Sequence, residues 1–220
     1  MTTNSVSKSV DSKPRWQCIL FDLDGTLVNS EVLNFRAYRD LIPEIDMTES
    51  ELIDHYCGVE MKPVIKDLEQ RYQLNMPDDF EDTFRAHVRE LYEAGLQAIP
   101  GIPQLLSALT VPIAVASNAP QKKIQHALAV TDLTQHFNDR LFSAYDINVW
   151  KPKPDLFLHA ARQMGIAAEQ CAVVEDSQPG VEAAVAAGMQ VFHYCPHGRQ
   201  ADREGYTSIE QMSELADFLL

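Results

Sequence analysis

The sequence lacks several features that would place it in a special class of protein. No stretch approaches the ~20 consecutive apolar residues that a membrane-spanning helix requires. The four cysteines are scattered and form no CxxC pair, which favours reduced thiols rather than a disulfide framework. We therefore expect a cytoplasmic protein without a membrane partner.

Positive charge is also scarce. The chain of 220 residues has 18 Lys and Arg against 32 Asp and Glu, a formal net charge of −14. Such an acidic surface argues against nucleic acid or an anionic membrane as a partner. It also repels a phosphorylated substrate, so a site for an anion would need local cations. Since no long apolar seam is present, we expect a monomer.

Strand-like and helix-like patterns alternate along most of the chain. Apolar runs predict strands covered on both faces at 17–23, 111–117, 140–143, 171–175 and 190–194. Apolar residues at helical spacing predict helices over 155–164 and 179–187. This alternation predicts an α/β fold with a doubly wound parallel sheet.

Two segments depart from the alternation. Residues 1–15 are rich in Ser, Thr and Lys without an apolar block, which predicts a disordered leader. Residues 32–99 show helical patterns but no convincing strand. We therefore expect a small helical domain over 32–99, inserted into a core formed by 16–31 and 100–220.

Polar side chains follow the predicted strands at their carboxyl ends, where open α/β sheets bind ligands. These side chains are Asp22 and Asp24 after the first strand, Ser117 and Asn118 after the second, Lys151 after the third, and Glu175 and Asp176 after the fourth. Carboxylates at the edge of an apolar core are costly unless a cation receives them, and oxygen ligands suit Mg²⁺. A lysine and a hydroxyl would hold the remaining oxygens of a phosphate. The pattern predicts a magnesium-assisted phosphate site.

These residues also belong to four motifs. In chain order they are Phe-Asp-Leu-Asp-Gly-Thr-Leu, Ala-Ser-Asn, Lys-Pro-Lys-Pro-Asp and Val-Val-Glu-Asp-Ser-Gln-Pro-Gly. In this order and spacing, over about residues 16–195, they resemble the motifs of the haloacid dehalogenase-like hydrolase superfamily. The resemblance implies a Rossmann-like core with a mobile helical cap inserted after the first motif, which matches the segment 32–99.

The resemblance implies distinct catalytic roles. Asp22 would be the nucleophile that forms an aspartyl-phosphate, and Asp24 would protonate the leaving oxygen and then activate water. Ser117, Asn118 and Lys151 would bind the transferred phosphoryl group. An acid at position 24 favours a phosphatase over a dehalogenase, because displacement of a halide needs no proton donor.

The resemblance also implies the cofactor, Mg²⁺. Asp22, the backbone carbonyl of Asp24, and Asp176 would hold the ion. Glu175 would be a further ligand, directly or through water, and a hydrogen-bonding role for Glu175 is an equal alternative.

Within the superfamily, the chain is most similar to the phosphosugar phosphatases and β-phosphoglucomutases. The mutases carry a histidine twelve residues after the nucleophile, where this chain has Asn34, which favours hydrolysis over mutase cycling. The run Tyr145-Asp146-Ile147, with Trp150 before Lys151, resembles the bacterial 6-phosphogluconate phosphatase branch and implies that substrate. A phosphomutase and a non-catalytic sugar-phosphate-binding protein remain alternatives. Lys62 and Asn34 are the candidate substrate contacts.

Simpler structural roles compete with these functional ones. Ser117–Asn118 and Asp176–Ser177 lie where each pair could cap the next helix. Lys62 has the alternative of a solvated lysine on the surface. The acidic run at 78–82 fits the first turn of a helix, where negative charge suits the dipole. We assign the seven histidines to packing or surface positions.

Overall fold

The computed structural model describes residues 15–56, 59, 61–196 and 198–220. The predicted disordered leader therefore lies outside the described residues, except for Arg15. Within the described residues, no helix is long and apolar enough to cross a membrane.

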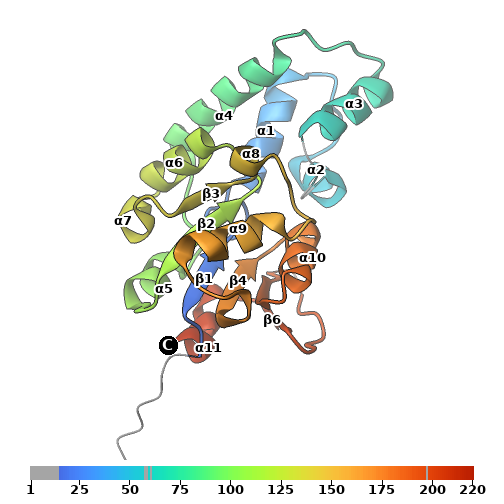
Figure 1. Cartoon of the computed structure of the whole chain (residues 1–220). Coiled ribbons are helices and arrows are strands. Elements are labelled where there is room, and N and C mark those ends of the chain that lie inside the picture. Colours follow the sequence, from blue (N-terminus) through green and yellow to red (C-terminus); the bar gives the residue numbers. More distant parts are fainter. Residues whose placement is uncertain (1–14, 57–58, 60, 197) are drawn as a thin grey trace, which may run out of the picture.

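A six-stranded parallel sheet forms the centre of the molecule (Figure 1). Its strands are β1 (Cys18–Phe21), β2 (Ile113–Ser117), β3 (Leu141–Ser143), β4 (Cys171–Glu175), β5 (Gln190–Tyr194) and β6 (Tyr206–Ile209). The spatial order is β3-β2-β1-β4-β5-β6, so the chain runs outward from β1 in one direction and then from β4 in the other. This arrangement confirms the predicted α/β, doubly wound, Rossmann-like sheet.

The boundaries of some predicted strands were wrong. β1 ends at Phe21 rather than at residue 23, and β2 and β3 each begin later than predicted. The sequence pattern also missed β6, a four-residue edge strand that pairs in parallel with β5. β4 and β5 have the predicted bounds.

Helices cover both faces of the sheet. They are α5 (Ile102–Ala108), α6 (Gln121–Val130), α7 (Thr134–Phe137), α8 (Ala144–Ile147), α9 (Asp155–Met164), α10 (Gln178–Ala186) and α11 (Ala216–Leu219), with short 3-10 turns at Ala168–Gln170 and Met212–Leu215. Alternate residues of β1 enter two separate cores: Phe21 packs with Phe137 on one face, and Leu20 packs with Phe157 on the other. The helix predicted over 155–164 has those bounds, whereas α10 begins and ends one residue earlier than predicted.

The described residues between 31 and 95 form four helices, which we call the four-helix segment. They are α1 (Glu31–Leu41), α2 (Glu49–Tyr56), α3 (Met61–Tyr72) and α4 (Phe80–Gly95), and the described residues between 32 and 95 contain no strand. α1 and α4 pack together, with the rings of Tyr38 and Phe84 4.3 Å apart. The acidic residues Glu81 and Asp82 lie in the first turn of α4, as the acidic run predicts.

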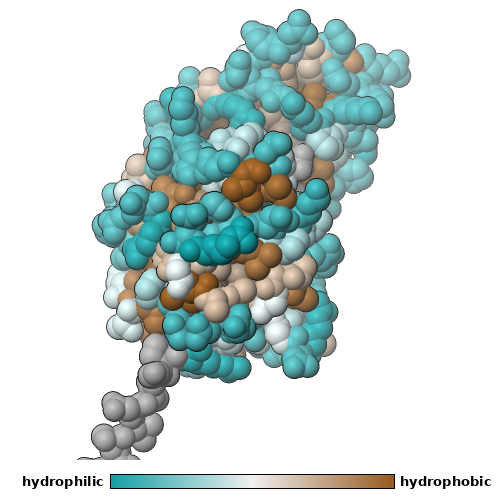
Figure 2. Space-filling model, viewed as in Figure 1, coloured by the Kyte–Doolittle hydropathy of each residue, from teal (hydrophilic) through white to brown (hydrophobic). Residues whose placement is uncertain are grey.

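The four-helix segment sits beyond the end of the sheet, at the top and upper right of Figure 1. The two chain segments that connect it to the sheet lie side by side, because Val28 pairs with Ala98 in an isolated bridge. Most of the face seen in Figure 2 is hydrophilic, on the four-helix segment as well as on the core.

Candidate active site

The turn after β1 brings two carboxylates to the carboxyl edge of the sheet. Asp22 still donates its backbone N–H to the carbonyl of Val174 at 3.0 Å, so it stays beside β4. Leu23 is fully buried, which leaves Asp22 and Asp24 to face away from the core. Gly25 then turns the chain with φ of 79°, a conformation that favours glycine.

Asp22 shares a buried lysine with Glu175. The Nζ atom of Lys151 lies 2.5 Å from Asp22 Oδ1 and 2.6 Å from Glu175 Oε1, and all three side chains are buried. Burial and the nearby charge of Glu175 raise the pKa of Asp22 to about 7, although the charge of Lys151 acts in the opposite direction. One cation therefore serves two buried carboxylates, and the cluster keeps an excess of negative charge.

The second carboxylate oxygen of Glu175 accepts hydrogen bonds at the start of α10. Glu175 Oε2 accepts hydrogen bonds from the backbone N–H of Ser177 at 2.8 Å and from its hydroxyl at 2.9 Å. Ser177 caps α10 by accepting from the N–H of Gly180 at 3.2 Å, so the capping role predicted for this pair falls to Ser177. Both carboxylate oxygens of Glu175 thus have hydrogen-bond partners within the protein.

Asp24 lies in a separate network that links three parts of the chain. It accepts from the Ser30 hydroxyl at 2.5 Å, from Lys123 Nζ at 2.8 Å and from the Tyr92 hydroxyl at 3.4 Å. Burial acts to raise the pKa of Asp24, but the charge and hydrogen bond of Lys123 outweigh it and leave the pKa below the ordinary value. Asp24 is therefore held as a carboxylate by groups from α6 and α4.

Asp176 lies directly against the turn after β1. Its Oδ1 accepts from the Thr26 hydroxyl at 2.6 Å. A Cβ atom added at Gly25 would come within 2.1 Å of Asp176 Oδ2, so only glycine leaves room for this approach. Burial, followed by the charges of Glu175 and Asp22, raises the pKa of Asp176 well above its usual range.

A histidine of β5, His193, forms a hydrogen bond with the backbone of Asp176. His193 Nε2 lies 2.9 Å from the carbonyl oxygen of Asp176, and its Nδ1 lies 2.6 Å from the Tyr206 hydroxyl. A carbonyl oxygen only accepts, so Nε2 donates this hydrogen bond to Asp176. His193 is thus a buried residue, as the packing assignment expects, but it also positions the loop of Asp176.

Ser117 and Asn118 connect the second strand to the loop of Lys151. Ser117 Oγ accepts from the N–H of Ala119 at 3.1 Å, and Asn118 Oδ1 accepts from the N–H of Lys151 at 3.0 Å. The N-cap of α6 is Pro120, so neither side chain caps that helix. The geometry brings Asn118 and Lys151 together as the motifs predict.

The two candidate substrate contacts lie in different environments. Asn34 Oδ1 accepts from the Tyr92 hydroxyl at 2.9 Å, which places Asn34 at the edge of the Asp24 network. The Lys62 side chain is 80% exposed, and its Nζ lies 3.9 Å from Glu81 on α4. The structure therefore groups Asn34, but not Lys62, with the acids of the first motif.

Sequence reasoning assigned no role to Lys123 or Tyr92. Lys123 lies in the first turn of α6, the helix that follows β2. Its position shortly after the end of a strand is the local feature that could have marked it as a candidate site residue. The spacing of Tyr92 in the sequence fits the buried, apolar face of α4, so it predicts packing rather than a polar contact. Only the fold brings their polar ends to Asp24.

The donor set fits a hard divalent cation. Asp176 offers carboxylate oxygens beside Gly25, and Asp22 offers others beside Lys151. Burial, followed by the charges of neighbouring carboxylates, raises the pKa of both acids, so a bound cation would offset an unfavourable charge there. Among the described residues, no three His, Cys, Asp or Glu side chains are already gathered around one metal position. Such an ion would therefore draw on two carboxylates, a backbone carbonyl and non-protein oxygens.

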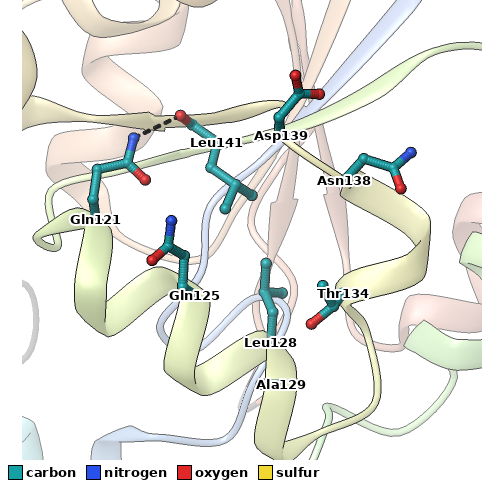
Figure 3. A pocket seen from close by; sticks show the side chains of 8 residues that line it. All are labelled: Gln121, Gln125, Leu128, Ala129, Thr134, Asn138, Asp139 and Leu141. Carbon is teal, nitrogen blue, oxygen red and sulfur yellow. Dashed lines mark hydrogen bonds between the residues drawn. The ribbon is translucent and has the colours of Figure 1, made fainter.

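A separate hollow of about 520 Å³ lies between α6, α7 and β3 (Figure 3). Its lining consists of Gln121, Gln125, Leu128, Ala129, Thr134, Asn138, Asp139 and Leu141. None of the candidate catalytic residues is among them. The carboxylate cluster, not this hollow, is the candidate active site.

Comparisons with known proteins identify similar sequences and similar solved structures. Residues 19–194 match the family model of the haloacid dehalogenase-like hydrolases. The 6-phosphogluconate phosphatase of Escherichia coli (strain K12) is 36% identical, over 92% of this chain and 94% of that protein. A haloacid dehalogenase-like protein of unknown function from Agrobacterium tumefaciens superposes with a TM-score of 0.79 at 28% identity, covering 92% of this chain and 96% of the other. A family hydrolase from Deinococcus radiodurans, solved with bound phosphate and sodium, gives a TM-score of 0.70 at 29% identity, covering 87% and 86% of the two chains.

Proposed function

This chain belongs to the haloacid dehalogenase-like hydrolases, and from that membership we propose a magnesium-dependent phosphatase of small sugar phosphates, with 6-phosphogluconate as the preferred substrate. The observation that carries the proposal is the meeting of Asp22, Asp24, Lys151 and Asp176 at one edge of the sheet. The named relative supports the choice of substrate.

In the first step, a carboxylate oxygen of Asp22 attacks phosphorus. The bond between phosphorus and the sugar oxygen breaks, and that oxygen takes a proton from Asp24. Lys151 already holds Asp22 Oδ1, which leaves the other oxygen of Asp22 to attack. Ser117, Asn118 and Lys151 bind the oxygens of the transferred group.

In the second step, Asp24 removes a proton from water. The water oxygen attacks phosphorus, the bond to Asp22 breaks, and inorganic phosphate leaves, with Asp24 protonated for the next turnover. In the free protein Lys123 holds Asp24 ionised. A bound phosphate dianion would raise the pKa of Asp24 and so supply the protonated form that the first step needs.

Asp22, the backbone carbonyl of Asp24, and Asp176 would hold Mg²⁺, which would supply positive charge to offset that of the phosphate oxygens. We assign Glu175 a supporting role, because its oxygens already accept hydrogen bonds from Lys151 and Ser177. Glu175 would then keep Lys151 in place rather than bind the ion directly.

We assign the four-helix segment, with the linkers that make up residues 32–99, the role of a cap that closes over the substrate. Its support is Tyr92 of α4, which already reaches Asp24 and Asn34 from this segment. Closure of such a segment excludes bulk water from the phosphoenzyme and adds contacts to the sugar.

The test is phosphate release from a panel of phosphorylated metabolites, with and without Mg²⁺. We expect release from 6-phosphogluconate and other sugar phosphates, dependent on the ion. A phosphomutase is the second candidate, and the presence of Asn34, whose amide does not act as an acid or a base at neutral pH, argues against it. Isomer interconversion of a sugar phosphate seen by NMR would establish the mutase. No phosphate release from any compound in the panel would favour a binding protein without catalysis.

A further inference from the structure

A second cationic region lies beside the catalytic acids. Lys151 forms ion pairs with Asp22 and Glu175. A second anionic group on a substrate would therefore need a different cation. Two other cations lie where the four-helix segment meets the core: Lys123 on α6 and Arg85 on α4. In a chain with a net charge of −14, such local cations decide where an anion binds.

Both cations act on the same buried phenol. The Tyr38 side chain of α1 is buried and packs on Phe84, the neighbour of Arg85. Burial raises the pKa of Tyr38, and the positive charges of Lys123 and Arg85 oppose that rise. The contacts with α8 place the two cations in one region. Gln121, two residues before Lys123 on α6, donates to Asp146 at 2.8 Å. Arg85 lies 3.5 Å from the hydroxyl of Tyr145, the residue before Asp146.

Lys123 borders the phosphate side of this region. Its Nζ lies 2.8 Å from Asp24 and 5.9 Å from the centre of the Tyr92 ring. An ammonium group has three N–H donors, so the bond to Asp24 leaves others for a ligand. Lys123 is thus beside the acid that we assign to proton transfer, and it keeps N–H donors for a ligand.

Arg85 lies on the side of this region away from Asp24 and contacts Tyr145 of the core. Its guanidinium lies 3.5 Å from the Tyr145 hydroxyl, and the Tyr145 ring packs edge-on against Trp150 at 5.5 Å. Trp150 directly precedes Lys151, so two aromatic rings connect Arg85 to the lysine that we assign to the phosphoryl group. The pairing of Arg85 with Glu81 at 3.9 Å is exposed and therefore weak, which leaves the guanidinium available.

We propose that Lys123 and Arg85 form a second anion site that recognises the carboxylate end of a phosphorylated sugar acid. The proposal rests on the proposed phosphatase function and adds the residues that select the substrate. A guanidinium binds a carboxylate with two parallel hydrogen bonds, which gives both affinity and orientation. Tyr145 and Trp150 provide the surface along which the carbon chain lies.

The experiment compares two substrates that differ only at the far end. 6-Phosphogluconate carries a carboxylate, whereas glucitol 6-phosphate has a hydroxymethyl group in its place and the same phosphate ester. The wild-type protein should favour 6-phosphogluconate in kcat/KM. Arg85→Gln should lower that preference about tenfold or more through KM, in line with the loss of a charged hydrogen bond, and Arg85→Lys should restore part of it.

Arg89→Gln is the matched control, because Arg89 is an exposed arginine on the same helix. It removes the same charge and should leave the preference unchanged. An equal loss on both substrates in Arg85→Gln, or an equal loss of preference in Arg89→Gln, would overturn the proposal. So would a wild-type protein without preference for the acid.

A binding measurement separates this proposal from the proposed function. Calorimetry with the Asp22→Asn variant reads the affinity of both compounds without turnover. Tighter binding of 6-phosphogluconate that is lost in Arg85→Gln would support the anion site. If the wild type at the same time released no phosphate, the phosphatase would be refuted and the anion site would stand. Equal binding of both compounds, together with phosphate release, would refute the anion site and leave the phosphatase standing.

Discussion

Lys123 Nζ lies 2.8 Å from Asp24 Oδ2, so α6 reaches into the turn that follows β1. This ion pair fixes a carboxylate that the proposed mechanism uses to carry a proton. Burial acts to lower the pKa of Lys123, but the charge of Asp24 outweighs it and keeps the lysine charged. The pair therefore sets the orientation of Asp24 as well as its charge.

The first prediction concerns this pair. In Lys123→Met, Asp24 keeps its bonds to Ser30 and Tyr92 but loses its cation. We expect kcat to fall about tenfold or more on every substrate, because a misplaced proton donor forfeits part of the gain from general acid catalysis. Steady-state rates on two sugar phosphates measure the effect. Lys122→Met, at the exposed neighbouring position, is the control and should match the wild type.

The second prediction concerns Asp22. Asp22→Asn should reduce turnover to background, since the amide cannot form the phosphoenzyme. The fold should survive, because the variant leaves one buried lysine with one buried carboxylate, Lys151 with Glu175. Burial, the first cause of the raised pKa of Asp22, also means that the wild-type charge is costly there. A thermal melt should therefore show no drop in Tm, and hydrolysis that persists in this variant would refute the assignment of the nucleophile.

Much of the fold and of the catalytic edge follows from local sequence patterns. The apolar runs that end in Asp22, Ser117 and Glu175 mark three strands, and parallel strands necessarily bring their carboxyl ends to one edge. Because both the strand and the polar group lie within the same few residues, such a site can be predicted without coordinates.

The partners of Asp24 could not be predicted in the same way. Lys123 is separated from Asp24 by 99 residues and Tyr92 by 68, so their meeting depends on how α4 and α6 pack. β6 escaped prediction for a related reason: its four residues gain strand geometry from pairing with β5 rather than from a pattern of their own. Contacts that the tertiary fold creates leave no short-range signal.

The third prediction concerns His193, which holds the loop of Asp176. In His193→Leu, the carbonyl of Asp176 loses its donor, and the acid beside it loses a fixed orientation. Groups that orient a metal ligand typically change metal affinity by about 10 to 100-fold, so we expect the Mg²⁺ concentration for half-maximal activity to rise by that order. Direct calorimetric titration with Mg²⁺ provides a readout that is independent of turnover.

Tyr206→Phe is the graded comparison for that variant. It removes only the hydroxyl beside Nδ1 and keeps both the ring and the bond from Nε2 to Asp176. Its effect on Mg²⁺ affinity should be several times smaller than that of His193→Leu. An unchanged affinity in a folded His193→Leu protein would show that His193 only fills space.

The last prediction concerns Gly180, in the first turn of α10. A Cβ atom at this position would lie 1.7 Å from Glu175 Oε1, the oxygen that binds Lys151. Gly180→Ala must therefore displace Glu175, and Lys151 would then lose one of its two anchors. We expect kcat to fall about tenfold and the free energy of unfolding to drop by about 1–3 kcal/mol, as for overpacking of a buried site. Gly95→Ala is the matched control, since a Cβ there meets nothing within 4 Å. If both variants behave alike, the contact between Gly180 and Glu175 does not constrain the lysine, and the supporting role of Glu175 in the mechanism falls with it.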